Sequence, residues 1–282
     1  MIQAPLIVNQ DCVNFVIDDI PKFNQSVIPQ PIAIIGRSGS GKTEILRRIS
    51  TKIPTAKFID GKHIFSTYEL MPLIANESVV LLDNAQYYFE RTSSEEQYKL
   101  RAVLNRNGAP TIVASFDKVP KAFTDYKAPF FDGFKFIFIK PVEPADCGDI
   151  DMERLSAIYS LMPPTIHSLN VAYNLILNNP DPQKDIDFAI DFQSQYFGQL
   201  YDSLPTNSQR IVNALANTSE GLLLADLKKV SGLDGSVISS YMQRLVRNNL
   251  VIKEVPKTYK TSYRLSDRLF ALWVSRQLNN RL

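Results

Sequence analysis

The sequence has only two cysteines and no apolar run long enough to cross a membrane. Cys12 and Cys147 are too few for a disulfide framework or for a four-ligand zinc site. The longest apolar runs, such as 79–82 and 32–35, are the length of a strand, far below the ~20 residues that span a bilayer. No basic residue precedes the short apolar stretch at the start, so this stretch does not resemble a secretion signal. We therefore expect a cytoplasmic protein that does not associate with membranes.

Charge is distributed unevenly along the chain. Residues 207–282 hold 12 Lys or Arg and 5 Asp or Glu, a balance of +7. Residues 1–206 hold 19 and 24 of these residues, a balance of −5, so the net charge of +2 conceals the difference. A basic C-terminal part on an acidic body indicates that this part meets a polyanion. The alternative is a solvated charged surface without a partner.

Short apolar runs alternate with helical spacing in the first half of the chain. Before residue 31 the pattern indicates only an irregular lead-in. After it, helices are predicted over 42–50, 67–74 and 94–105, and strands over 31–35, 56–59, 79–83, 111–115 and 134–139. Strands that alternate with helices predict an α/β fold with a parallel sheet covered on both faces.

The second half changes character twice. Helices are predicted over 153–161, 165–177 and 185–196, broken by proline and asparagine clusters. From Thr206, a capping-type residue, the predicted order is three helices and two strands, which is typical of a winged helix: 206–216, 223–230, 236–248, 250–255 and 261–265. We therefore predict a P-loop nucleotide-binding core over 1–148, a helical lid over 149–204 and a winged-helix domain over 205–282.

A phosphate-binding motif joins the first predicted strand to its helix. Residues 36–43 match G-x-x-x-x-G-K-[ST] without departure, and the candidate nucleotide-binding residues are Gly36, Arg37, Ser38, Gly39, Ser40, Gly41, Lys42, Thr43 and Glu44. Glycines let the backbone N–H groups surround a phosphate, and the positive end of the following helix faces the anion. Lys42 is expected to contact the β- and γ-phosphates, and the Thr43 hydroxyl to bind Mg²⁺. A chance glycine-rich turn is the alternative.

The strand over 79–83 ends in Asp83, where P-loop enzymes place the carboxylate that holds Mg²⁺. Asp83 could instead cap the next helix. Asn84 follows, where a glutamate commonly polarises the attacking water, and an amide does not accept a proton at neutral pH. The sequence therefore predicts slow or partner-dependent hydrolysis. Ser115, which ends the neighbouring strand, is a candidate γ-phosphate sensor, Asp117 is a second, and a merely structural Ser115 is the alternative.

The predicted winged helix offers a set of residues for DNA contact. Its third helix would enter the major groove and its hairpin would touch the phosphate backbone. Ile238, Met242 and Leu245 would face the core. The candidate residues for nucleic-acid contact are Ser239, Ser240, Gln243, Arg244, Arg247, Lys253, Lys257, Lys260 and Arg264.

The order of these parts resembles the AAA+/STAND group of P-loop ATPases. The run Tyr263–Trp273, with Asp267 and Phe270, is similar to the end of archaeal-type ATPases with a C-terminal winged helix, and Asp83-Asn-Ala-Gln86 resembles their Asp-Glu-Phe-Gln. A weaker resemblance, over 94–117, is to bacterial replication initiator ATPases. The resemblance implies ATP as the nucleotide. We assign Asp267, Phe270 and Trp273 a structural role, with Asp267 as a helix cap.

The chain departs from these families in the groups that assist hydrolysis. Residues 130–134 contain no arginine before the last core strand, and Arg101 and Arg106 are substitutes by location only. The lid motif at 161–164 lacks its usual glycines, and His167 beside it is an isolated histidine. The first hypothesis is therefore an ATP-controlled switch that binds double-stranded DNA and in which ATP favours a closed or an oligomeric arrangement. A homo-oligomer and a complex with a protein partner are both left open. The rivals are a STAND-type signalling or defence ATPase whose winged helix binds a protein, and a small-molecule kinase.

Overall fold

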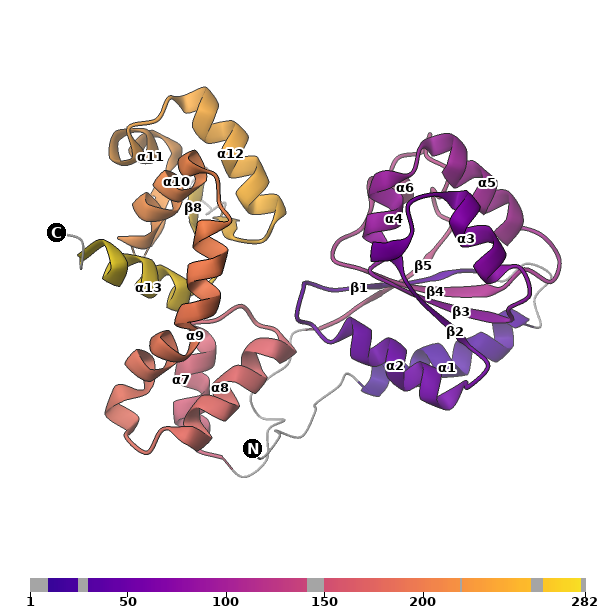
Figure 1. The fold of residues 1–282 in the computed structure, drawn as a ribbon, viewed down its shortest axis with the longest axis horizontal. Helices are drawn as coiled ribbons and strands as arrows, with labels where there is room; N and C mark the ends of the chain where they lie inside the picture. Colours follow the sequence, from indigo (N-terminus) through magenta and orange to yellow (C-terminus); the bar gives the residue numbers. More distant parts are fainter. Residues whose placement is uncertain (1–9, 25–29, 141–149, 219, 255–260, 280–282) are drawn as a thin grey trace. The chain divides into compact units, whose positions relative to one another are not determined.

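The computed structural model describes residues 10–24, 30–140, 150–218, 220–254 and 261–279 (Figure 1). The chain forms two compact units, which we describe separately. Among the described residues, the core unit comprises 10–24 and 30–140 together with 165–167, and the C-terminal unit comprises 150–164, 168–218, 220–254 and 261–279. The further division of the C-terminal unit into lid and winged helix stays a prediction.

Five short parallel strands form the sheet of the core unit. They are β1 (Ile32–Ile35), β2 (Lys57–Asp60), β3 (Val79–Asp83), β4 (Thr111–Phe116) and β5 (Lys135–Phe138), in the order β2-β3-β4-β1-β5. All four strand pairs are parallel. β1, β3 and β4 are buried along their whole length, because helices cover both faces. The predicted α/β class with a parallel sheet is confirmed.

Helices pack on the two faces of this sheet (Figure 1). α1 (Gln10–Asn24) and α2 (Lys42–Lys52) cover one face, where Val16 and Leu46 pack against Ile34 and Val113. The other face carries α3 (Thr67–Ile74), α4 (Gln86–Arg91), α5 (Ser94–Leu104), α6 (Lys121–Thr124) and the short 3₁₀ helix η1 (Gly61–His63). A cluster of aromatic rings fills this second core: Phe89, Phe116, Phe123, Phe130 and Phe134.

Helix α1 corrects the predicted irregular lead-in. Val13, Val16 and Ile20 have helical spacing and are 3% exposed or less, so the sequence carried the signal. Pro21 and the polar residues around it obscured that signal, because proline disfavours the interior of a helix. Packing of this apolar side against α2 and the sheet stabilises the helix in spite of its composition.

The first part of the C-terminal unit is helical. α7 (Met152–Ser160), α8 (Ile166–Asn178) and α9 (Asp185–Asp202) are joined by a turn that includes the 3₁₀ helix η3 (Pro182–Lys184). The turn is fixed by a polar network, in which Arg154 Nη2 donates to Asp185 Oδ1 at 2.6 Å and Asn179 Nδ2 donates to the same atom at 2.8 Å. Bonds from Arg154 lower the pKa of Asp185, and burial opposes this shift. α9 runs six residues past its predicted end at Tyr196, because Phe197 packs on the rings of Phe270 and Trp273.

The remaining elements form a second, antiparallel sheet with its helices. They are α10 (Thr206–Ala216), β6 (Leu222–Leu223), α11 (Leu224–Ser231), α12 (Gly235–Arg247), β7 (Val251–Glu254), β8 (Ser262–Leu265) and α13 (Arg268–Asn279), and the strand order is β6-β8-β7. This is the predicted order of helices and strands, with the short β6 added. Ile238, Met242 and Leu245 of α12 are buried as predicted. The prediction of Thr206 as a cap is wrong: Pro205 precedes α10, and no side chain caps it. None of the described helices has both the length and the apolar character of a membrane span.

Asp267 caps α13, as predicted from the sequence. Its Oδ1 accepts a hydrogen bond from the Phe270 amide at 3.0 Å. Burial raises the pKa of this carboxyl from 3.8 to about 6, although the amides of Phe270 and Leu269 oppose the shift. The folded chain therefore holds this proton more tightly than the unfolded chain does. The stability that the proton contributes is complete below pH ~4 and is lost as the pH rises through ~6.

We expect Asp267→Asn to unfold at a higher temperature than the wild type at pH 8, because asparagine caps a helix without ionising. The shift of two pKa units corresponds to about 2 kcal/mol after allowance for relaxation. Asp267→Ala should lose the cap and be less stable by about 1 kcal/mol even at pH 4.5. Thermal unfolding followed by circular dichroism at both pH values measures these differences. An Asp267→Asn variant with the same pH dependence as the wild type would contradict the shifted pKa.

Candidate nucleotide site

The loop between β1 and α2 has the geometry of a phosphate cradle. Gly39 and Gly41 have φ angles of 79° and 89°, which favour glycine. A Cβ at Gly36 would lie 2.5 Å from Ser40 Oγ, so no larger residue fits there without a shift. Gly41 precedes α2 and no side chain caps this helix, which leaves its first N–H groups for a ligand. The Ser40 hydroxyl is buried and has no hydrogen-bond partner among the described residues.

Lys42 lies over this loop with its ammonium group held by three acceptors. Nζ donates to the carbonyls of Gly36 at 2.7 Å and Arg37 at 2.9 Å. It also donates to Asp117 Oδ1 at 2.8 Å, and the Lys42 side chain is 7% exposed. Asp117 follows β4, so the end of the strand beside β1 supplies the counter-charge. This carboxylate competes with any phosphate for the lysine.

Asp83 joins the loop to the sheet. Its Oδ2 accepts from Thr43 Oγ1 at 2.7 Å, and its Oδ1 accepts from Ser115 Oγ at 2.5 Å. The three residues come from α2, β3 and β4, and they meet because β3 and β4 are parallel neighbours whose carboxyl ends share one edge. The backbone reinforces the junction: the Ala85 amide donates to the Ser115 carbonyl, and the Gly36 amide donates to the Phe116 carbonyl. The structure thus brings the predicted metal-binding pair and the predicted sensor together.

Asn84 directs its side-chain amide toward the end of β2, and its backbone N–H donates to Asp83 Oδ1 at 3.0 Å. It has a φ angle of 52°, and its Nδ2 donates to Asp60 Oδ1 at 3.0 Å. Asp60 and Asp83 are register partners across β2 and β3. Burial raises the pKa of Asp60, but the hydrogen bonds from Lys62 and Asn84 and the nearby Lys62 and His63 charges outweigh it and lower the pKa. Asn84 therefore neighbours an ionised carboxylate at neutral pH.

Sequence reasoning missed two residues of this site. Asp60 is one of them, and the signal for it was an acid that ends a strand beside Asp83. Gln86 is the other: its Nε2 donates to Asp117 Oδ2 at 3.1 Å, and its Oε1 is buried without a hydrogen-bond partner in the part of the chain that the structure describes. Gln86 ends the run Asp83-Asn-Ala-Gln86, which indicated a family resemblance but no role for Gln86 in the site.

Other predicted residues lie at the margin of the cradle. Arg37 and Ser38 are exposed in the loop, and Glu44 lies within hydrogen-bonding range of Arg48 one turn along α2, at 3.4 Å. The core unit includes 165–167, where the His167 amide donates to the Gly39 carbonyl at 3.0 Å. Backbone rather than imidazole contacts the loop at this point.

The residues predicted to meet DNA divide into several groups. Ser239 donates its hydroxyl to the Gly235 carbonyl at 2.9 Å, within its own helix. Arg264 Nε donates to Glu254 Oε1 at 2.5 Å, across β7 and β8. Lys257 and Lys260 lie outside the described residues. The remaining candidates are exposed: Ser240, Gln243, Arg244, Arg247 and Lys253.

Comparison with known proteins shows likeness in fold. No protein-family model matches the chain, and no curated protein does. The ORC1 protein of Aeropyrum pernix, solved in complex with DNA, matches with a TM-score of 0.55 and 10% identity, over 99% of this chain and 96% of ORC1. Drosophila ORC bound to DNA matches with a TM-score of 0.50 and 9% identity, over 97% and 88%. The chain therefore shares with these two proteins a fold whose core is an α/β unit built on a parallel sheet.

Proposed function

We propose that this chain binds ATP with Mg²⁺ and acts as a nucleotide-controlled switch with slow or partner-dependent hydrolysis. The observation that carries the proposal is the chain of contacts from Thr43 through Asp83 to Ser115, at the edge where the glycine loop begins α2. The hydroxyl and carboxylate oxygens offered by Thr43 and Asp83 suit Mg²⁺, which takes its remaining ligands from water and phosphates.

The cradle suits a triphosphate on three further grounds. The unpartnered Ser40 hydroxyl is buried in the loop and is available to a phosphate oxygen. Lys42 holds its ammonium group against the same loop, at the carbonyls of Gly36 and Arg37. The open N-terminus of α2 adds backbone donors and a positive dipole. Bound Mg²⁺ would neutralise phosphate charge, and Thr43 and Asp83 would hold it.

Slow hydrolysis follows from how the nearby acids are engaged. A general base must accept a proton from the attacking water. Asn84 has no such capacity, and its amide is bonded to Asp60. Asp83 accepts from Thr43 and Ser115, and Asp117 accepts from Lys42 and Gln86. Each of these carboxylates already has hydrogen-bond donors, so none is a free base for water.

Neither of the two arginines predicted as substitutes hydrogen-bonds to a described residue of the nucleotide site. The segment 130–134 contributes Phe130 and Phe134 to the aromatic cluster instead of a charge. Arg101 donates to the Pro129 carbonyl, and Arg106 follows α5 at the surface. A partner or a second copy of the chain would have to supply any arginine that stabilises the transferring phosphoryl group, which is why we propose a partner-dependent reaction.

We further propose that the C-terminal unit forms a winged helix that binds double-stranded DNA. Gln243, Arg244 and Arg247 are exposed on α12, the helix that would enter the major groove, and Lys253 is exposed on β7. The fold neighbours ORC1 and Drosophila ORC were each solved with DNA, which supports this assignment by analogy.

One observation favours the rival, a STAND-type protein whose winged helix binds another protein. The Arg264–Glu254 pair neutralises one of the basic candidates of the hairpin. A partly neutral hairpin weakens attraction to phosphate and suits a protein surface better. Binding of a protein partner together with absence of DNA binding would identify this alternative.

Charge reversal on α12 should distinguish the hypothesis that the winged helix binds DNA from the hypothesis that it binds a protein. We expect Arg244→Glu combined with Arg247→Glu to weaken binding to duplex DNA about tenfold or more at low salt, because each arginine neutralises a phosphate. The slope of log affinity against log salt should fall by about two. Fluorescence anisotropy at several salt concentrations, with and without ATP, measures both quantities.

The matched control is Arg210→Glu combined with Arg276→Glu, which changes the net charge equally on α10 and α13. This control should retain most of the DNA affinity. Equal losses in the two double variants would mean that net charge alone attracts DNA and would contradict recognition by α12.

A further inference from the structure

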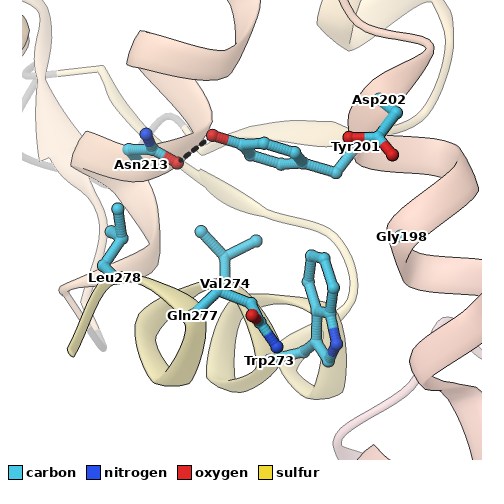
Figure 2. Close-up of a pocket in the computed structure, with 8 residues that line it drawn as sticks. All are labelled: Gly198, Tyr201, Asp202, Asn213, Trp273, Val274, Gln277 and Leu278. Atoms are coloured by element: carbon cyan, nitrogen blue, oxygen red, sulfur yellow. Dashed lines mark hydrogen bonds between the residues drawn. The ribbon is translucent and has the colours of Figure 1, made fainter. Parts of the chain in front are cut away.

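A small cavity lies between three helices of the C-terminal unit (Figure 2). Its volume is about 190 Å³. Residues of α9, α10 and α13 line the cavity: Gly198, Tyr201, Asp202, Asn213, Trp273, Val274, Gln277 and Leu278. A cavity of ~150 Å³ admits a molecule of the size of benzene, so this space holds one large side chain.

Two aromatic rings form part of its wall. The ring centroids of Tyr201 and Trp273 lie 6.1 Å apart, with their planes at 63°. The polar atoms of both rings are already bonded, since the Tyr201 hydroxyl donates to Asn213 Oδ1 at 3.0 Å and Trp273 Nε1 donates to Ser194 Oγ at 3.0 Å. The hydrogen-bond donors of both rings are therefore engaged within the protein, and the rings remain as aromatic wall.

A carboxylate completes the lining. Asp202 is exposed and makes no ion pair within the described part of the chain. α9 carries four aspartates and no lysine or arginine. Two of these, Asp185 and Asp191, pair with Arg154 and Arg276. The negative charge at this cavity therefore lacks a described counter-ion, and it disfavours a phosphate backbone.

Gly198 keeps the cavity open. Gly198 lies in the interior of α9, where glycine makes a helix less stable than alanine does. The φ angle of Gly198 is not positive. An added Cβ would have Trp273 Cζ2 as its nearest atom at 3.9 Å, which is an ordinary van der Waals contact. Neither backbone conformation nor crowding requires glycine here. The consequence of the missing Cβ is free space beside the indole ring.

We propose that this cavity binds the guanidinium group of an arginine side chain presented by a partner protein. A cation over Trp or Tyr is attracted by the ring quadrupole, and a carboxylate beside it adds a charge-assisted hydrogen bond. Arginine fits better than lysine because its group is planar, weakly hydrated and able to stack. The space admits one side chain, which is why a protein residue fits better than a larger free ligand. This site is independent of nucleotide and DNA binding.

The chain's single tryptophan lines the cavity and reports on it directly. We expect acetyl-Gly-Arg-Gly-amide, added to the full chain, to change the intrinsic tryptophan fluorescence with a saturable dependence. The matched peptide with citrulline in place of arginine keeps the shape without the charge and should bind about tenfold more weakly. Absence of saturation, or equal affinity for both peptides, overturns the proposal. Tighter binding of agmatine than of the peptide overturns the assignment to a protein partner.

Two variants test the lining without disturbing the fold. Asp202→Asn should lower the affinity for the arginine peptide about fivefold, which is the effect expected from loss of a single exposed ion pair. Asp187→Asn removes the same charge from an exposed position of α9 outside the cavity and should leave the affinity unchanged. Gly198→Ala should weaken binding while α9 becomes no less stable, since alanine favours a helix. Equal effects of Asp202→Asn and Asp187→Asn would overturn the role of Asp202.

Discussion

Replacing Lys42 with alanine should weaken ATP binding about 100-fold, whereas replacing Asp117 with asparagine should strengthen it. Lys42 is the buried cation of the cradle, and loss of charge-assisted bonds to phosphate costs about 3 kcal/mol. Asp117 holds the same ammonium group at 2.8 Å and must release or share it when a phosphate arrives. Its neutral counterpart no longer competes as a charge, and we expect a gain of about tenfold. Isothermal titration of ATP with Mg²⁺ at fixed ionic strength measures both affinities.

The opposite signs are the distinguishing result. Asp18→Asn removes a negative charge from α1, on an exposed position away from the cradle, and serves as the control for net charge. It should leave ATP affinity within a factor of two of the wild type, since an exposed charge at this range is screened by salt. A weaker ATP affinity in Asp117→Asn would show that the carboxylate supports the bound state instead of competing with it.

A carboxylate in place of Asn84 should raise the rate of the ATP hydrolysis that we propose for this chain. We expect Asn84→Glu to raise the turnover of ATP about tenfold or more, since a positioned general base contributes about 10²–10⁴-fold. The new acid would lie beside Asp60, and the two like charges would repel. Combining it with Asp60→Asn restores an amide–carboxylate pair with its positions exchanged, and turnover should rise further. Phosphate release under saturating ATP is the measurement.

Asn84→Gln is the control, because it lengthens the side chain and keeps the amide. It should remain as slow as the wild type. Rapid hydrolysis by the wild type would contradict the proposed switch, and an unchanged rate in both glutamate variants would place the deficit elsewhere, for example in an arginine that a partner supplies.

Local patterns in the sequence were sufficient for the parts of this site that are contiguous. The glycine loop, the strand ending at Asp83 and the strand ending at Ser115 each carry a short signal, and the structure places them at one edge. The Asn84–Asp60 bond had no such signal. Residues 60 and 84 meet because β2 pairs with β3. No short segment of the sequence predicts the order of the strands in a sheet, so this contact could not be predicted.

The same distinction explains the fold. Helices with a regular apolar side, such as α3, were predicted at their observed ends. α1 was missed because its stability comes from packing on α2 and the sheet, against the tendency of Pro21. The last turn and a half of α9 was missed for a similar reason, since Phe197 gains its contacts from the distant residues Phe270 and Trp273.

The end of β4 has a consequence for where the chain tolerates a change of length. Three consecutive residues there serve different parts of the site: Ser115 contacts Asp83, the Phe116 carbonyl accepts from Gly36, and Asp117 holds Lys42. One inserted residue there would shift the partners of Asp83, Gly36 and Lys42 out of register together. Gly108, three residues before the start of the strand, is exposed with open space around it, so an inserted tag is better tolerated there.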